Sequence, residues 1–287
     1  NNRMQVGVDQ PGTGQDIVLN ADVASGGGQV TVRGARAVTL NAGADVVSGG
    51  SGTVDVEALA GALTLADDAR VLTDGRNVRL VAETDVVLGV VDARTAADRL
   101  ANGTANQAAW GNVAVTAVNG AIRDAGAAGS TSVRIYGHGV RLLAGTDIGS
   151  LDQPAFRLQY TTNFAVWTDL VTLTGTDAVM SYTDPTPVDS RRFYRLVLAD
   201  NGVTARFRQP EILGDRSVRL TWDVTLGAGY APMIRYLAVE ARTLSARTLT
   251  GSQAIGEASG VEIGSVAAPV SVVGADGTVS GVSDGAQ

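Results

Sequence analysis

The sequence contains three equally spaced tetrapeptides: Gln29-Val30-Thr31-Val32, Thr53-Val54-Asp55-Val56 and Asn77-Val78-Arg79-Leu80. Each alternates polar and apolar residues, and their first residues lie 24 positions apart. Alternation with a period of two is typical of a β-strand with one face buried and the other in solvent. Two equal intervals indicate a repeat, and a fixed period of this length usually decides the architecture of a chain.

Two more strand-like runs follow in each interval. The second run is Val38-Thr39-Leu40, Leu63-Thr64-Leu65 and Val86-Val87-Leu88 in successive repeats, and the third is Val46-Val47 and Val71-Leu72. Clusters of Gly, Ser and Asp, such as residues 48–52 and 73–75, supply the turns between them. We therefore predict an all-β fold: a right-handed parallel β-helix, or β-solenoid, with three strands and about 24 residues in each coil.

Stacked coils pair each strand with its counterpart one repeat later, at a spacing of roughly 4.8 Å. This arrangement predicts that Val30, Val54 and Val78 lie side by side on one sheet. Apolar residues recur at the inward positions because no coil buries its apolar face alone. Since only 5% of the residues are aromatic, the core is expected to consist of thin layers of small aliphatic side chains.

The repeat is interrupted at two places. Asn112-Val113-Ala114-Val115 begins 35 residues after Asn77, so we expect residues 93–111 to form a protruding loop or short helix on one coil. The pattern ends near Ser150 and returns from Leu237. We expect three segments: a parallel β-helix over residues 1–155, an inserted β segment over 156–236, and the β-helix continuation with a Gly-rich tail over 237–287.

The inserted segment has a different composition, because it holds most of the aromatic residues. Aromatic and β-branched runs joined by proline-containing turns favour an antiparallel, sandwich-like arrangement. Residues 158–163 and Phe193-Tyr194-Arg195-Leu196 resemble the latter half of bacterial fibronectin type III or immunoglobulin-like modules, and residues 210–213 and 218–222 are similar to the opening half. The halves occur in reverse order, as expected of a permuted or degenerate module, or of side sheets packed on the helix.

The remaining two-thirds of the chain resembles filamentous-haemagglutinin-like β-helical proteins and related giant bacterial surface proteins. The resemblance rests on the 24-residue coils and on the turn Gly145-Thr146-Asp147-Ile148-Gly149-Ser150. It implies secretion, an elongated shape, and a role in adhesion or filament building.

Composition excludes several classes of function. All 22 basic residues are arginine, so Schiff-base chemistry, a phosphate-loop lysine and lysine isopeptide crosslinks are absent. The net charge of −7 disfavours nucleic-acid binding, which needs clustered basic residues. The absence of cysteine removes disulfides, zinc–thiolate sites and thiol nucleophiles, and it is compatible with secretion.

The chain shows no apolar run of about 18 residues that could cross a bilayer and no leader after Asn1. With Asn at position 1, we expect it to be a processed or excised piece of a longer protein. An extracellular or cell-surface location is expected from the resemblance and from the cysteine-free composition.

The candidate chemical residues are few. His138, the single histidine, could act as a general base near neutral pH, or it is a turn residue flanked by Gly137 and Gly139. Asp67, Asp68 and Asp74 could form a glycosidase carboxylate pair, although adjacent aspartates in turns more often serve as turn formers.

Three further motifs have residue types that are found in binding sites. The Asp74-Gly75 and Asp276-Gly277 turns offer oxygen ligands, so structural calcium is an alternative to an otherwise cofactor-free chain. Gly26-Gly27-Gly28 and Gly49-Gly50 lack the following lysine and helix of a phosphate loop and are expected to be corners. The run from Arg191 to Arg195, with Phe193 and Tyr194 between arginines, could attract an acidic glycan or another acidic partner, or its alternate residues simply face water.

These observations predict no enzymatic activity and no catalytic, cofactor-binding or metal-binding residues. The predicted function is a structural or adhesive segment of a large secreted bacterial surface protein, forming a stalk or a head-to-tail filament. Expected partners are other copies joined end to end, glycans, or a host or neighbouring cell surface. Two alternatives are a β-helical polysaccharide lyase or depolymerase, and a glycan-binding module centred on residues 156–236.

Overall fold

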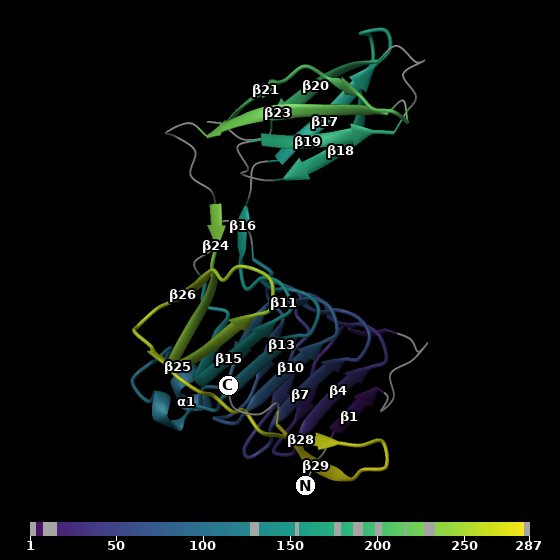
Figure 1. Ribbon diagram of the computed structural model, residues 1–287. Helices are drawn as coiled ribbons and strands as arrows, with labels where there is room; N and C mark the ends of the chain where they lie inside the picture. Colours follow the sequence, from purple (N-terminus) through teal and green to yellow (C-terminus); the bar gives the residue numbers. More distant parts are fainter. Residues whose placement is uncertain are drawn as a thin grey trace. The chain divides into compact units, whose positions relative to one another are not determined.

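The computed structural model describes residues 4–7, 16–126, 132–152, 155–174, 179–185, 192–198, 203–215, 217–226 and 233–283. The chain divides into two compact units (Figure 1). The solenoid unit comprises Asn1–Ser150 and Ile234–Gln287, and the sandwich unit comprises Leu151–Met233. Almost all regular structure is β-strand.

The solenoid unit consists of parallel strands stacked in three columns, which we call the first, second and third faces. Figure 1 shows the strands of the first face side by side. The first face contains β1 (Met4–Gly7), β4 (Val30–Gly34), β7 (Val54–Ala58), β10 (Val78–Ala82) and β13 (Val113–Ala117). Val54 pairs with Val30 on one side and with Val78 on the other, all in parallel register. The prediction that these three valines share one sheet is confirmed.

The other two faces are built from shorter strands. The second face contains β2 (Ile17–Leu19), β5 (Val38–Leu40), β8 (Leu63–Leu65), β11 (Val86–Leu88) and β14 (Ile122–Asp124). The third face contains β3 (Val23–Ser25), β6 (Val46–Ser48), β9 (Arg70–Leu72) and β12 (Val90–Asp92). Paired residues are 25 positions apart for Val38 and Leu63 but 20 apart for Val71 and Val91, because the turns differ in length.

Two long strands belong to both the first and the third face. In β15 (Ile135–Ala144), Ile135 pairs with β12 of the third face and Val140 pairs with β13 of the first face. β25 (Leu237–Thr248) follows the same path, since Val239 pairs with Ile135 and Leu244 with Val140. These two strands join both faces into one 13-stranded sheet.

The interior of the solenoid unit is aliphatic, as predicted. Its core cluster contains Val, Leu, Ile and Ala from every coil between β4 and β25, most of them fully buried. Inward residues of one coil stack on their counterparts in the next, as Val32 does on Val56. Complete burial of each Val or Leu side chain contributes roughly 1.5–3 kcal/mol to folding, so the stack is held together by many equivalent contacts.

The first interruption of the repeat is a raised segment between β12 and β13, and of the two predicted forms, a loop or a short helix, the structure shows short helices. It contains α1 (Ala96–Leu100) and the 3-10 helix η1 (Gln107–Ala109). Thr95 caps α1 by accepting a hydrogen bond from the Asp98 backbone N–H at 3.1 Å. The Trp110 indole then donates to the Asp98 carboxylate at 2.9 Å, which closes the segment on itself.

After β26 (Ile255–Glu257) and β27 (Glu262–Ile263) the chain turns back along the solenoid. Residues 265–273, here called the C-terminal strap, cross the outer side of the first face in reverse coil order. Asn112 and Asn77 donate side-chain hydrogen bonds to the Ala267 and Pro269 carbonyl oxygens, each at 2.7 Å. The Ser271 and Val273 backbone N–H groups donate to the Thr53 and Thr31 hydroxyls, each at 2.9 Å.

Alternate residues of the strap pack inward. Val266, Ala268, Val270 and Val272 are all buried. The strap ends in an antiparallel hairpin of β28 (Val270–Val273) and β29 (Val279–Val282). Part of the segment predicted to be a Gly-rich tail is therefore a strand, because the Asp276-Gly277 turn lets the chain reverse.

The sandwich unit has two antiparallel sheets. One contains β18 (Thr168–Thr174), β17 (Ala155–Thr161) and β20 (Phe193–Leu198); the other contains β19 (Val179–Asp184), β23 (Val218–Leu226), β21 (Val203–Phe207) and β22 (Glu211–Ile212). Phe156 and Leu158 pack against Leu220, Trp222 and Val224 in a shared core. The Phe156 and Trp222 ring centroids are 6.5 Å apart, so the sheets pack face to face. β16 (Ser150–Asp152) pairs with β24 (Met233–Arg235).

Candidate functional site

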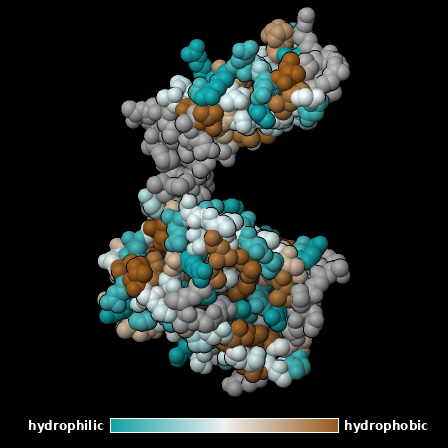
Figure 2. Space-filling view, viewed as in Figure 1, coloured by the Kyte–Doolittle hydropathy of each residue, from teal (hydrophilic) through white to brown (hydrophobic). Residues whose placement is uncertain are grey.

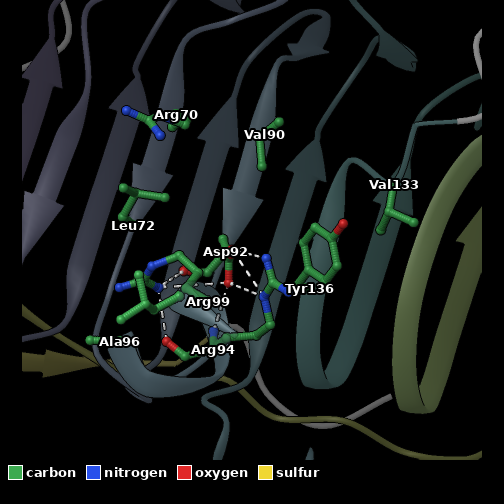
Figure 3. Close-up of a pocket in the computed structure, with 10 residues that line it drawn as sticks. Arg70, Leu72, Val90, Asp92, Arg94, Ala96, Arg99, Val133 and Tyr136 are labelled. Carbon is green, nitrogen blue, oxygen red and sulfur yellow. Dashed lines mark hydrogen bonds and ion pairs between the residues drawn. The ribbon is translucent and has the colours of Figure 1, made fainter. Parts of the chain in front are cut away.

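The solenoid unit carries a hollow of about 510 Å³ on the outer side of its third face (Figure 3). Ten residues line it: Arg70, Leu72, Val90, Asp92, Arg94, Ala96, Arg99, Leu100, Val133 and Tyr136. They come from β9, β12, the first residues of β15, the raised segment with α1, and the chain just before β15. The hollow exists because α1 stands beside strands that are otherwise open on their outer side.

Parallel register sets the floor of the hollow. Asp92 pairs with Leu72 on one side and with Tyr136 on the other, and Val90 pairs with Arg70. Side chains at paired positions point to the same side of a sheet. Figure 3 shows Leu72, Asp92 and Tyr136 following one another across neighbouring strands.

Asp92 and Arg94 form a buried ion pair at the base of the hollow. Arg94 donates from Nη2 to Asp92 Oδ2 at 2.7 Å and from Nε to Oδ1 at 3.1 Å, and its backbone N–H donates to Oδ1 at 2.9 Å. Asp92 is 2% exposed and Arg94 is 6% exposed. The guanidinium carbon of Arg94 lies 3.8 Å from the centroid of the Tyr136 ring, so the pair and the ring hold each other in place.

Two further guanidinium groups border the hollow. Arg99 in α1 donates from Nη1 to the carbonyl oxygens of Thr73 at 2.7 Å and Arg94 at 2.9 Å. Arg70 donates from Nε and Nη2 to one carboxylate oxygen of Asp45, at 3.0 and 2.6 Å. The hydrogen bond to Asp45 raises the pKa of Arg70, so this side chain stays charged. Burial likewise raises the pKa of Tyr136, which keeps its hydroxyl neutral.

The structure places His138 at the bend of β15. Its Nδ1 lies 3.1 Å from the Gln107 carbonyl oxygen, and its backbone N–H donates to the Gly111 carbonyl oxygen at 2.9 Å. These contacts tie the raised segment to the corner between the third and first faces. Gly139 is required there, because a Cβ would lie only 2.9 Å from the Val266 side chain.

The predicted acidic candidates contact different partners. The Asp67 carboxylate pairs with Arg134 at 2.6 Å, whereas Asp74 accepts the Ala96 backbone N–H at 2.7 Å, at the start of α1. Asp276 accepts from the Thr278 hydroxyl at 2.7 Å and shapes the β28–β29 turn. Within the described ranges, no group of three or more His, Cys, Asp or Glu side chains is arranged to hold a metal ion.

The arginine–aromatic run of the sandwich unit belongs to a cluster that we call the aromatic patch: Phe164, Trp167, Phe193 and Arg195. The Phe164 and Phe193 ring centroids are 4.0 Å apart, and the Arg195 guanidinium lies 4.2 Å from the Trp167 ring centroid. Phe164 is 61% exposed and has a φ of 63°, which is strained for a bulky residue. Tyr194 instead packs inward and donates to the Asp184 carboxylate at 2.8 Å. Arg191 lies outside the described residues.

The sequence contains no motif that predicts the hollow. Its one local signal is the Asp92-Ala93-Arg94 triplet, placed where the 24-residue repeat breaks. Asp92 pairs with Tyr136, which lies 44 positions further along the chain. A short stretch of sequence around either residue does not predict this pairing.

On the face seen in Figure 2, hydrophobic side chains lie in small patches separated by hydrophilic ones. Among the helices of the described residues, none has the length and apolar character needed to span a membrane. Comparisons with protein-family models, with curated proteins and with solved structures gave no match to this chain.

Proposed function

We propose that this chain is a structural and adhesive segment of a large secreted bacterial surface protein. In this proposal the solenoid unit is a right-handed β-helix of about 24 residues per coil that serves as a stalk, and the sandwich unit is a module inserted into its sequence. The location outside the cell and the bacterial origin rest on the sequence resemblance and on the cysteine-free composition.

One observation carries the proposal: the coils keep their register across the whole inserted unit. Ile148 on the second face pairs with Ile122 before the insertion and with Gln253 after it. Val239, after the insertion, pairs in parallel register with Ile135, before it, so the two strands are direct neighbours in the stack. A solenoid tolerates such an insertion because each coil contacts only its neighbours. This property suits a scaffold that displays other modules.

The two ends of the stack favour association of copies. Among the described residues, β1, β2 and β3 have a strand neighbour on one side only, as do β26 and β27 at the other end. Ile263 in β27 is 80% exposed. Open strand edges pair readily with other chains, and head-to-tail contacts that do not close into a ring give filaments.

Electron microscopy of the purified chain tests this proposal. We expect rods or head-to-tail fibres, and we expect that Ile263→Asp shortens them by placing a charge on the edge strand. Val118→Asp is the matched control, since Val118 is exposed on the side of a coil rather than at its end. Compact monomers that release oligosaccharides from a bacterial or plant polysaccharide would support the alternative, a β-helical lyase or depolymerase.

A second candidate function is glycan binding by the sandwich unit, and the aromatic patch favours it. Phe164 is exposed, and Trp167 and Phe193 are half-buried. Aromatic rings offer flat apolar surfaces to sugar rings, and Arg195 adds a charge beside them. We expect Trp167→Ala to lower binding to immobilised oligosaccharides. Val179→Ala, an exposed apolar position in the same unit, is expected to leave it unchanged. Equal binding by both variants would remove the patch from consideration.

A further inference from the structure

We propose that the hollow on the third face binds an acidic saccharide, through recognition of a sugar carboxylate. The proposal stands on the geometry of the hollow and does not depend on whether the solenoid acts as a stalk.

The first argument is the local charge. The lining contains three guanidinium groups, on Arg70, Arg94 and Arg99. They face two carboxylates, that of Asp92 in the lining and that of Asp45, which pairs with Arg70. This excess of positive charge occurs in a chain whose net charge is −7. One more guanidinium group than carboxylates is present, so an anionic ligand is favoured at this place.

The second argument is the donors that the guanidinium groups present. The hydrogen bonds of Arg70 to Asp45 use Nε and Nη2, which leaves Nη1 for a ligand. The contacts of Arg99 with backbone carbonyls use Nη1, which leaves Nε and Nη2. The planar fork of a guanidinium group matches the geometry of a carboxylate and gives short, charge-assisted hydrogen bonds.

The third argument is that the base of the hollow is already ordered. Asp92 and Arg94 are more than nine-tenths buried and hold each other by several hydrogen bonds. Tyr136 is fixed between Arg94 and Trp110, whose ring centroid lies 6.5 Å from that of Tyr136. Side chains in a pre-formed site lose little conformational entropy on binding. A larger share of the contact energy therefore contributes to affinity.

The fourth argument distinguishes a saccharide from a simple anion. Leu72, Val90 and Val133 line the hollow beside the arginines, and Leu100 on α1 is 91% exposed at its border. Inorganic sulfate or phosphate is too small and polar to pack against these apolar side chains. A sugar ring could pack its C–H faces against them. The volume of about 510 Å³ lies within the range of small-molecule sites.

Isothermal titration calorimetry on the full chain tests the proposal. The acidic ligands are trigalacturonic acid and sialyllactose, and the neutral counterparts are galactotriose and lactose. We expect binding of at least one acidic ligand and no measurable binding of its neutral counterpart. Binding of neutral and acidic sugars alike, an equal response to inorganic sulfate, or no binding of either acidic ligand would overturn the proposal.

Two variants locate the binding. Arg70→Gln is expected to weaken it about tenfold or more, as loss of a charged hydrogen bond does, and Leu100→Ser is expected to weaken it severalfold. Arg36→Gln is the matched control, because Arg36 is similarly exposed and forms the same kind of pair with Asp16 at 2.9 Å. Unchanged thermal unfolding of the variants shows that they fold. Unchanged affinity in both Arg70→Gln and Leu100→Ser would place the binding elsewhere and overturn the assignment.

Discussion

At the scale of single residues, the outer side of the first face contains charges that are not in solvent. Asp55 is fully buried, and Arg79 on the next coil donates from Nη1 to its Oδ1 at 2.8 Å. The same Arg79 group donates to Glu57 at 3.0 Å, and Glu57 pairs with Arg33 at 2.6 Å. Charges of alternating sign therefore link successive coils, and they do so at a desolvation cost that only close pairing offsets.

The pH dependence of stability follows from Asp55. Burial raises the pKa of Asp55 from its ordinary value of 3.8 to about 6, and the attraction of Arg79 only partly opposes this. The folded state therefore favours the protonated form. The resulting stability is fully present below about pH 4 and is lost as the pH rises through about 6. From the size of the shift, the change is roughly 2 to 3 kcal/mol.

Urea unfolding at pH 5 and pH 7.5 measures this effect. We expect Asp55→Asn to remove part of the gain in unfolding free energy that the natural chain shows at the lower pH. Asp16→Asn is the control, because hydrogen bonds from the Ala37 backbone and Arg36 lower the pKa of Asp16, so its contribution is lost as the pH falls. Identical pH profiles for Asp55→Asn and the natural chain would show that Asp55 titrates normally.

At the scale of elements, the C-terminal strap connects coils that are distant in sequence. Between Val266 and Val273 it contacts β15, then the residues that precede β13, β10 and β7, and then β4, so it runs against the order of the coils along the chain. Four of these coils contribute a polar side chain to the strap, from Asn112, Asn77, Thr53 and Thr31. The strap therefore resists separation of the coils in a way that stacking alone does not.

Removal of residues 265–287 is expected to destabilise the first face. The loss of four hydrogen bonds and of the buried strap valines should lower the unfolding free energy by at least about 3 kcal/mol. Hydrogen exchange should also speed up in β4, β7 and β10. Removal of residues 274–287 alone keeps the strap and serves as the control. Equal exchange rates in the two truncated chains would contradict a stabilising role for the strap.

The raised segment is expected to unfold locally without unfolding of the stacked strands. Asp98→Ala removes the carboxylate that accepts from Thr95 at 2.8 Å and from Trp110 at 2.9 Å. Hydrogen exchange should then speed up across residues 95–110 while that of β7 and β10 stays unchanged, because those strands pair without it. Faster exchange throughout the solenoid unit would show that the segment supports the stack.

At the scale of the whole molecule, the insertion and the solenoid are expected to fold independently. Each has its own core, one aliphatic and one built around Phe156 and Trp222. A chain in which a short Gly-Ser turn replaces residues 151–233 should keep cooperative thermal unfolding and a β-rich circular dichroism spectrum. Removal of residues 54–65, which is half a coil, should abolish the cooperative unfolding and the β-rich spectrum. Each later strand would then lie beside strands of a different face and could not pair in register. Aggregation of the first variant would show that the insertion is needed for folding.

The parts of the fold that could be predicted are those with a local signal. Alternation along each strand and the equal spacing of Val30, Val54 and Val78 sufficed to place three strands on one face, since parallel stacking repeats the same contacts coil after coil. The aliphatic core followed from the same alternation. Uniform spacing did not hold on the other faces, because short turns change length without disturbing the stack.

By itself, the sequence determined the strands, their inward residues and the stacking direction of the regular coils, because these depend on neighbours along the chain and on a constant period. Only the tertiary structure decided the bend of β15, the path of the strap and the hollow over β12. Thr53 meets Ser271 across 218 positions, and Asp92 meets Tyr136 across 44. Such contacts depend on the different lengths of the coils and on the reversal of the chain after β27. A repeat of constant period in the sequence does not predict them.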